Sequence, residues 1–453
     1  MWKLTIKKLI DHIYFFKRHL KRKKPFNKCN KVIWIAEVGT RDFIPRLNQA
    51  FHLWEKYKIS SIVIHKHFLK YLTKKDFQRT LVIDKSATLS CLDRIRYCRL
   101  RGAITSVIPE ELITVNNNID LVAAALHRYS LAQLDYIFAS ENFALEYAKL
   151  NNVIAIDCLN PRFNVVEIKN LKDKLDIKSN EIIKKPFIVI NDNTFYEYSA
   201  YEHEEDLIQN LFKKSGRKSE KYIYEGKQED IQYRNNLKRF VEEIYSNNHL
   251  KDLDIVIRPH PAVNIDKFKS FFFPILPNSN RIKIERTGDA LSIMAEAEGV
   301  FHQNCTTGLE GYYAGLNNIF NFAEMPRNGF SENNLNISPC LGIEGSIKAF
   351  ELFLKGKDNF KKKISSNLFE KKKNLYDIIG EEIKNKNSLY KNEKIKKNRN
   401  NDLKETFHSK KVFDKFNNGR WNFAEEILYS LKKKNSKYKK VLGSVGIVIG
   451  NWQ

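Results

Sequence analysis

Short runs of apolar residues alternate with amphipathic stretches along most of the chain. In the first half, strands are predicted at residues 31–38, 59–66, 79–86, 103–111, 134–140 and 152–158. Helical patterns lie between them, as in "RDFIPRLNQAFHLWEKY" and "ATLSCLDRIRYCRLRG". Because strands that alternate with helices form parallel sheets, this series predicts a doubly wound α/β domain over residues 30–165.

A second series of the same kind follows a charged stretch. Residues 166–185, "VEIKNLKDKLDIKSNEIIKK", lack a deep apolar pattern and are interpreted as a linker. Beyond it, strands are predicted at residues 186–193, 252–261, 281–288, 299–304 and 317–322. The second domain therefore covers residues 186–354. Two such domains in one chain favour a ligand site in the cleft between them.

The two ends of the chain have a different pattern. Residues 1–29 contain an apolar stripe at helical spacing, flanked by Lys and Arg, which is typical of a helix lying on an anionic membrane surface. The members of the stripe are Trp2, Ile6, Leu9, Ile13, Phe16 and Leu20. A basic helix packed on its own domain fits the same pattern. Residues 355–453 are rich in Lys and Asn and are interpreted as a helical extension.

Composition narrows the classes of function. The 453 residues carry a net charge of +25, which indicates an anionic partner. The basic residues concentrate in the two ends, and no sequence signature of a nucleic-acid-binding domain is present. Six scattered cysteines form no CxxC pair, which favours a reducing cytoplasm. No apolar run approaches the ~20 residues that span a bilayer.

Two polar loops follow strands of the second domain. Thr306, Thr307 and Gly308 stand between the strand "GVFHQN" and a helix, where hydroxyls and free backbone N–H groups suit a phosphate. A threonine that only caps the helix is the alternative. His260 follows the strand "DIVIR", at the same edge of the sheet. Together the two loops predict an anion site, with His260 donating charge-assisted hydrogen bonds.

The order "IVIRPHP" followed by "RTGDALSIMAEAEGVFHQNCTTGLEGYYAG" resembles a bacterial surface-polysaccharide biosynthesis family. That family has a GT-B fold and is related to the capsule Kdo transferases, and the motifs are also similar to those of bacterial sialyltransferases. "RGAITSVIPEEL", "LNPRFNVV" and "FIVINDNTF" match further segments, so the resemblance covers roughly residues 31–350. Asn164 and Pro109 depart from the pattern, as does the absence of a Gly after Glu111.

The resemblance implies a GT-B fold, with two Rossmann-like domains facing a cleft. It implies a glycosyltransferase that moves Kdo or a sialic-acid-like nonulosonic acid from its CMP-activated form onto a surface glycan or a lipid-linked acceptor, without a metal or other cofactor. The residues expected to bind the nucleotide sugar are Arg258, His260, Pro261, Asn304, Thr306, Thr307, Gly308 and Glu310.

Transfer of a sugar needs a carboxylate as base or nucleophile. Glu110, Glu111 and Asp192 are the candidates because each lies at the end of a predicted strand, and Glu37 is a further one. Solvated or capping carboxylates are the alternative. Arg41 and Arg46 could bind the acceptor, or belong to a solvated helix face.

Other functions remain open at this point. A UDP-sugar transferase or a sugar-nucleotide epimerase could use the same fold, and so could an inactive binding scaffold. A nucleic-acid partner is not expected. The predicted location is the cytoplasm, at the inner face of the membrane.

Overall fold

The structure is a computed structural model. It describes residues 25–37, 39–110, 122–123, 125–175, 186–194, 220–260, 263–272, 279–285, 290–313, 315–326, 338–356, 372–387, 439–441 and 446–449. The chain divides into two compact units. The first contains residues 1–112, 119–171 and 367–453, and the second contains residues 113–118 and 172–366.

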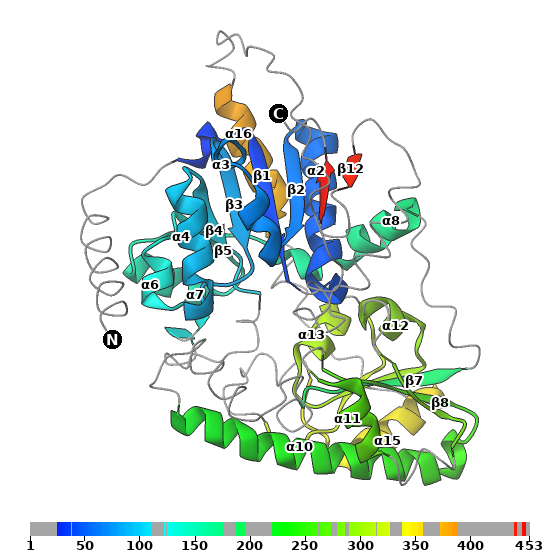
Figure 1. The fold of residues 1–453 in the computed structure, drawn as a ribbon. Helices are drawn as coiled ribbons and strands as arrows, with labels where there is room; N and C mark the ends of the chain where they lie inside the picture. Colours follow the sequence, from blue (N-terminus) through cyan, green and yellow to red (C-terminus); the bar gives the residue numbers. More distant parts are fainter. Residues whose placement is uncertain are drawn as a thin grey trace. The chain divides into compact units, whose positions relative to one another are not determined.

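The first unit is built on an eight-stranded sheet (Figure 1). Its strands are β1 (Lys31–Ala36), β2 (Ser60–His65), β3 (Thr80–Asp84), β4 (Ile104–Val107), β5 (Tyr136–Ala139), β6 (Ile154–Asp157), β12 (Lys439–Val441) and β13 (Gly446–Ile449). Strands β1 to β6 are parallel and stand in the order β2-β1-β3-β4-β5-β6, as the apolar runs predict. The order reverses direction between β1 and β3, so the carboxyl ends of these strands mark a topological switch point.

The helices of this unit connect its strands. They are α2 (Ile44–Tyr57), α3 (Lys74–Phe77), α4 (Leu92–Leu100), α6 (Arg128–Leu131), α7 (Asn142–Leu150), α8 (Val165–Leu175) and α16 (Leu375–Asn387). Helix α8 occupies the first part of the segment expected to be a linker, and the division between the two units falls inside it. Within the predicted helix 87–102, a 3-10 turn at Leu89–Cys91 leads into α4, which ends at Leu100; Gly102 follows with a φ of 100°, which is accessible to glycine.

Residues from the C-terminal segment complete the first sheet. β13 pairs antiparallel with β2, and β12 pairs antiparallel with β13. Val448 enters the core cluster that contains Ile33 and Ile62, and α16 packs against α2. The described parts of residues 355–453 thus include two strands as well as one helix, and from residue 367 they belong to the first unit.

The second unit contains a five-stranded parallel sheet in the order β11-β10-β7-β8-β9. Its strands are β7 (Phe187–Asn191), β8 (Asp254–Arg258), β9 (Ile282–Ile284), β10 (Gly299–His302) and β11 (Ile319–Asn321). Its helices are α10 (Glu220–Ser246), α11 (Ile265–Phe271), α12 (Ala290–Glu296), α13 (Thr306–Tyr313) and α15 (Gly342–Leu354). In chain order this is the Rossmann arrangement 3-2-1-4-5, with its switch point between β7 and β10.

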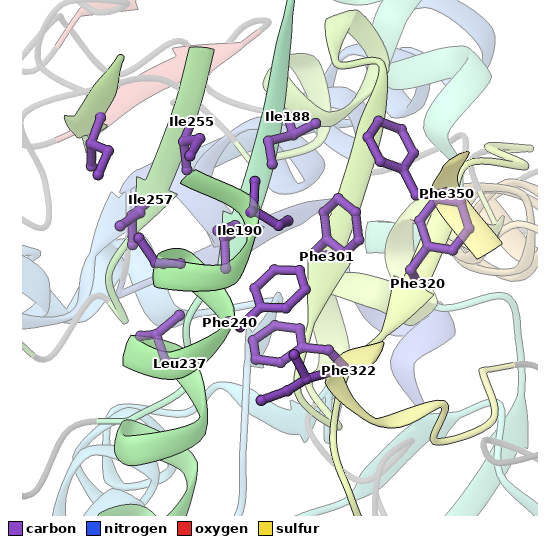
Figure 2. Close-up of a cluster of buried hydrophobic side chains, with 14 of the residues drawn as sticks. Ile188, Ile190, Leu237, Phe240, Ile255, Ile257, Phe301, Phe320, Phe322 and Phe350 are labelled. Atoms are coloured by element: carbon purple, nitrogen blue, oxygen red, sulfur yellow. The ribbon is translucent and has the colours of Figure 1, made fainter. Parts of the chain in front are cut away.

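Both faces of the second sheet are covered, since every residue of β7, β8 and β10 is buried. Figure 2 shows one face, where Ile188 and Ile190 of β7 pack with residues of α10 and α15. The ring of Phe240 stacks on Phe322, with centroids 4.1 Å apart. The intervening residues of β7 join a second cluster on the other face with α12. A strand buried on both faces belongs to the interior of a parallel sheet, as the uninterrupted run "FIVIN" predicts.

The expected two Rossmann-like domains are therefore confirmed. The described helices include none that is both long and apolar enough to cross a membrane. Of the expected membrane-surface helix, residues 1–29, residues 1–24 lie outside the described residues, and Phe26–Lys28 form a 3-10 turn.

Candidate functional site

The switch point of the second sheet gathers several of the predicted residues. Asp192, Asn193 and Thr194 follow β7, His260 follows β8, and Gln303 to Thr307 follow β10. Strand β7 lies between β8 and β10, so all three loops leave the same edge of the sheet. Ligands of open α/β sheets bind at such an edge.

Asp192 joins the loops that follow β7 and β8. Its backbone N–H donates to the carbonyl of Arg258 at 2.9 Å, and its carboxylate accepts from the backbone N–H and the hydroxyl of Thr194 at 3.1 and 2.9 Å. Burial raises the pKa of Asp192 to about 7, although hydrogen bonds from Thr194 and from the backbone of His260 oppose the shift. This carboxyl group can therefore hold or release a proton near neutral pH.

Two amide side chains at the switch point have unused acceptors. Asn193 donates to the carbonyl of Gln303 at 2.7 Å, and Gln303 donates to the carbonyl of Tyr233 in α10 at 2.8 Å. These bonds fix the two side chains through their nitrogens. Among the described residues, Asn193 Oδ1 and Gln303 Oε1 are buried and have no hydrogen-bond partner. Buried acceptors without partners are costly, and a ligand that supplies O–H or N–H groups satisfies them.

The side-chain amide of Asn304 is bonded to other residues of the second unit. Asn304 has a positive φ of 44°. Its side-chain nitrogen donates to Tyr233 Oη at 3.1 Å and to the carbonyl of Met325 at 2.8 Å, while its oxygen accepts from Asn321 at 2.7 Å. Asparagine tolerates a left-handed backbone conformation better than most residues. The sharp turn after β10 and the hydrogen bonds of the side-chain amide together explain why an asparagine occupies this position.

Thr306 and Thr307 begin α13 and are partly exposed, as the sequence predicts. Gly308 is packed against His302, because a Cβ at this glycine would lie 2.3 Å from His302 Nε2. His302 is fully buried, contacts Ser338 Oγ at 2.8 Å, and accepts from the backbone N–H of Cys305 at 3.4 Å. Burial lowers the pKa of His302 to about 3, so its ring is neutral. Gly308 thus allows α13 to approach β10.

The first unit holds a buried ion pair between two predicted residues. Arg46 Nη2 lies 2.6 Å from Glu110 Oε1, and both side chains are almost completely buried. The contact lacks hydrogen-bond geometry. Burial raises the pKa of Glu110, and Asp42 adds to the shift, whereas Arg46 and Arg162 oppose it. Neither Glu110 nor Arg46 belongs to a solvated surface. The partly exposed Arg41 donates to Asp42 at 2.9 Å.

Glu37 lies at the switch point of the first sheet, directly after β1. Lys66 and Lys85 both contact its carboxylate, the latter at 2.8 Å. These two lysines hold the pKa of Glu37 well below its usual range against the effect of burial. Next to them Arg94 forms a two-pronged pair with Asp84, at 2.6 and 2.9 Å. An ionised Glu37 between two lysines is poorly suited to act as a base.

Other predicted residues are less informative. Glu111 and Pro261 lie outside the described residues. Arg258, at the end of β8, is buried, and Glu310 lies on α13, half-buried. Within the described part of the chain, no three His, Cys, Asp or Glu side chains gather as a metal site. The sequence predictions missed Asn193, Gln303 and His302, although "INDN" and "FHQN" both place polar residues directly after apolar runs.

Two α/β units, each with a largely parallel sheet and its own switch point, define a two-domain, Rossmann-like fold of the GT-B type. Solved structures of similar fold include S. aureus MnaA with UDP (12% identity, 80% of this chain and 96% of the other, TM-score 0.45). The UDP-GlcNAc 2-epimerase of Neisseria meningitidis with UDP-GlcNAc is also similar (12% identity, 80% of this chain and 100% of the other, TM-score 0.43). So is the UDP-GlcNAc 2-epimerase of Methanocaldococcus jannaschii with UDP-GlcNAc and UDP (14% identity, 72% of this chain and 92% of the other, TM-score 0.42). No protein-family model and no curated protein sequence matches the chain.

These comparisons correct two expectations. The similar structures hold UDP or UDP-GlcNAc, where a CMP-activated acidic sugar was expected as the partner. Two of those named above are 2-epimerases, so the expected transfer of Kdo or a nonulosonic acid to a surface glycan or lipid-linked acceptor is wrong. The specific resemblance to Kdo transferases and sialyltransferases is likewise unsupported. At this level of identity the likeness extends to the fold alone.

Proposed function

We propose that the chain is an enzyme that binds a UDP-activated sugar at the switch point of the second sheet and epimerises the sugar. A sugar-nucleotide epimerase was the alternative function considered for this fold, and it remains after CMP-dependent transfer is excluded. The observation that carries the proposal is the pair of buried oxygens, Asn193 Oδ1 and Gln303 Oε1, that lack hydrogen-bond partners among the described residues. Ribose hydroxyls and the uracil N3–H are donors that fit them.

The same edge provides for the diphosphate. The N-terminus of α13 lies at this edge, and the dipole of this helix favours negative charge there. The hydroxyl of Thr306 adds a donor, and the imidazole N–H of His260 adds a further one. Their placement suits a phosphate close to Thr306, with the nucleoside toward Gln303.

Epimerisation requires that a proton leave one face of a carbon and return to the other. A carboxyl group suits this task when its pKa lies near the working pH. Asp192 has such a pKa, and the pKa of Glu110 is also raised. We assign proton transfer to this class of group, with Asp192 first because it shares the edge with the proposed nucleotide site.

Nucleotide binding is tested by calorimetry and thermal shift with UDP, UDP-GlcNAc and CMP. We expect UDP and UDP-GlcNAc to stabilise the protein, by about 2.7 kcal/mol at a hundredfold excess over Kd. The double variant Thr306→Ala/Thr307→Ala should weaken binding at least tenfold, since each charge-assisted bond contributes about 1.5–3 kcal/mol. The control Ser246→Ala removes an exposed hydroxyl at the end of α10 and should change nothing.

Turnover is tested by NMR of UDP-GlcNAc in D2O without any acceptor. An epimerase produces a second sugar-nucleotide signal, and the product carries one deuterium because the returning proton comes from solvent. Release of UDP only when a sugar acceptor is added would instead identify a transferase. Binding without any turnover would identify a scaffold, and absence of UDP binding would overturn the whole proposal.

A further inference from the structure

A strongly basic surface lies on the first unit. It comprises η3 (Lys66–Tyr71), α3 with its flanking turns to residue 79, and residues 94–101 of α4 and its C-cap, here called the η3–α4 patch. These 22 residues contain nine Lys or Arg and one acidic residue. The acid, Asp76, is buried and caps α3 by accepting from the backbone N–H and the hydroxyl of Thr73.

Some of this charge is used inside the unit. Lys66 pairs with Glu37, Arg94 with Asp84, and Arg99 with Asp135. Others face solvent: Lys70, Lys74, Lys75 and Arg79 are exposed. The exposed charge of the patch is therefore positive, with Asp93 of α4 as an exposed acid at its border, and a partner that complements it must be anionic.

Large apolar and aromatic side chains lie among these cations. Tyr71 is 47% exposed and Leu100 is 59% exposed. They come from separate elements that are tied together, because Tyr97 of α4 donates to the carbonyl of Lys70 at 3.2 Å. The guanidinium of Arg101 lies 3.5 Å from the centre of the Tyr97 ring. A rigid surface thus presents an aliphatic tip and a phenol, with cations on both elements.

We propose that the η3–α4 patch docks on an anionic lipid bilayer. Tyrosine is favoured at the headgroup level, leucine at the border of the hydrocarbon, and lysine and arginine against anionic headgroups. A nucleic acid would use the cations and could stack on a tyrosine, but it offers little to an exposed leucine. The combination of Leu100 with the lysines therefore favours the bilayer. This proposal is independent of the activity at the second sheet.

The test is co-sedimentation of the full chain with vesicles of phosphatidylcholine alone or mixed with phosphatidylglycerol. We expect binding to the anionic vesicles only, weakened by salt. Each basic residue near an anionic surface strengthens partitioning about fivefold, so Lys74→Glu/Lys75→Glu should lower the partition coefficient at least about twenty-fivefold. Tyr71→Ser/Leu100→Ser should lower it about tenfold, and both variants should fold because the replaced side chains are exposed.

Matched controls separate the patch from general effects of charge and apolarity. Lys348→Glu/Lys355→Glu makes the same change in net charge at exposed positions of the second unit. Leu150→Ser removes an apolar side chain that is 80% exposed at the end of α7. Neither control should weaken binding. Wild-type partitioning by both patch variants would overturn the proposal. So would tighter binding to an oligonucleotide that the same patch variants abolish, which would identify a nucleic-acid partner.

Discussion

Gly308 offers a sharp test of how α13 is placed. Substitution by alanine would put a Cβ 2.3, 2.5 and 2.6 Å from three atoms of the His302 ring, where ordinary contacts are near 3.5–4.0 Å. The ring cannot move easily because it is fully buried and bonded on both nitrogens, to Ser338 and to the N–H of Cys305.

The magnitude follows from opposing effects. Overpacking of this kind costs about 1–3 kcal/mol, and a displaced His302 loses hydrogen bonds of about 1 kcal/mol each. Replacing glycine in a helix returns up to about 1 kcal/mol. We expect Gly308→Ala to destabilise the second unit by about 2–3 kcal/mol and to weaken UDP binding, because α13 carries Thr306 and Thr307.

The assay can report the two units separately. The residues of the second unit include no tryptophan, whereas Trp34 of β1 and Trp54 of α2 belong to the first unit, so tryptophan fluorescence can follow the first unit. Far-UV circular dichroism follows both. In a urea titration, Gly308→Ala should shift the dichroism transition and leave the fluorescence transition in place. Gly345→Ala in α15 is the control, because its Cβ would meet only Leu341 at 3.4 Å and should not destabilise the unit.

A double-mutant cycle decides whether the contact is the cause. In the His302→Ala background the new methyl group has space, so Gly308→Ala should cost at least about 1 kcal/mol less than in the wild type. Additive effects, or a fully stable Gly308→Ala protein, would refute the reasoning.

Three further results are expected. The pKa of Asp192 is raised from 3.8 to about 7 in the folded protein, so between these pH values the folded protein holds a proton that the unfolded chain has released. The contribution of Asp192 to the free energy of unfolding is therefore lost as pH rises from about 4 to 7. Asp192→Asn should flatten this part of the stability profile measured by urea unfolding. Gly380→Ala should destabilise the first unit by about 1–3 kcal/mol in the fluorescence transition, since its Cβ would lie 2.2 Å from the Tyr57 ring; an unchanged transition would contradict the packing of α16 on α2. Ile447→Ala should cost about 2–5 kcal/mol in the same transition because this side chain of β13 is fully buried, and a cost below 1 kcal/mol would mean that β13 does not seal the sheet in solution.

The strands of both sheets follow from the sequence because apolar runs such as "KVIWIA" and "FIVIN" can be buried only in a parallel sheet covered on both faces. The pairing of β13 with β2 does not follow from the sequence, since an apolar run does not indicate which strand it pairs with. The segment expected to be a linker is helical from Val165 to Leu175 because its apolar residues, few as they are, have helical spacing.

The candidate site was only partly predictable for a similar reason. Thr306 and His260 stand where strands end, which a local pattern reveals. Arg46 and Glu110 pair although they lie far apart in the sequence. Because both residues are charged, a solvent-exposed position was the alternative considered for each of them. Asn304 was expected to bind a ligand, yet its amide is occupied by neighbours that only the folded chain brings together.

The pairing of β13 with β2 imposes an order on biosynthesis. A ribosome that adds about 5–20 residues per second needs roughly 20–80 s to pass from β2 to β13, and throughout that interval the edge of β2 has no strand beside it on that side. All the strands of the second unit emerge within the interval, so the domain encoded later can finish folding before the domain encoded first. A nascent chain stalled before residue 439 should therefore present β2 as an open edge, the kind of surface that chaperones shield and that pairs with other chains.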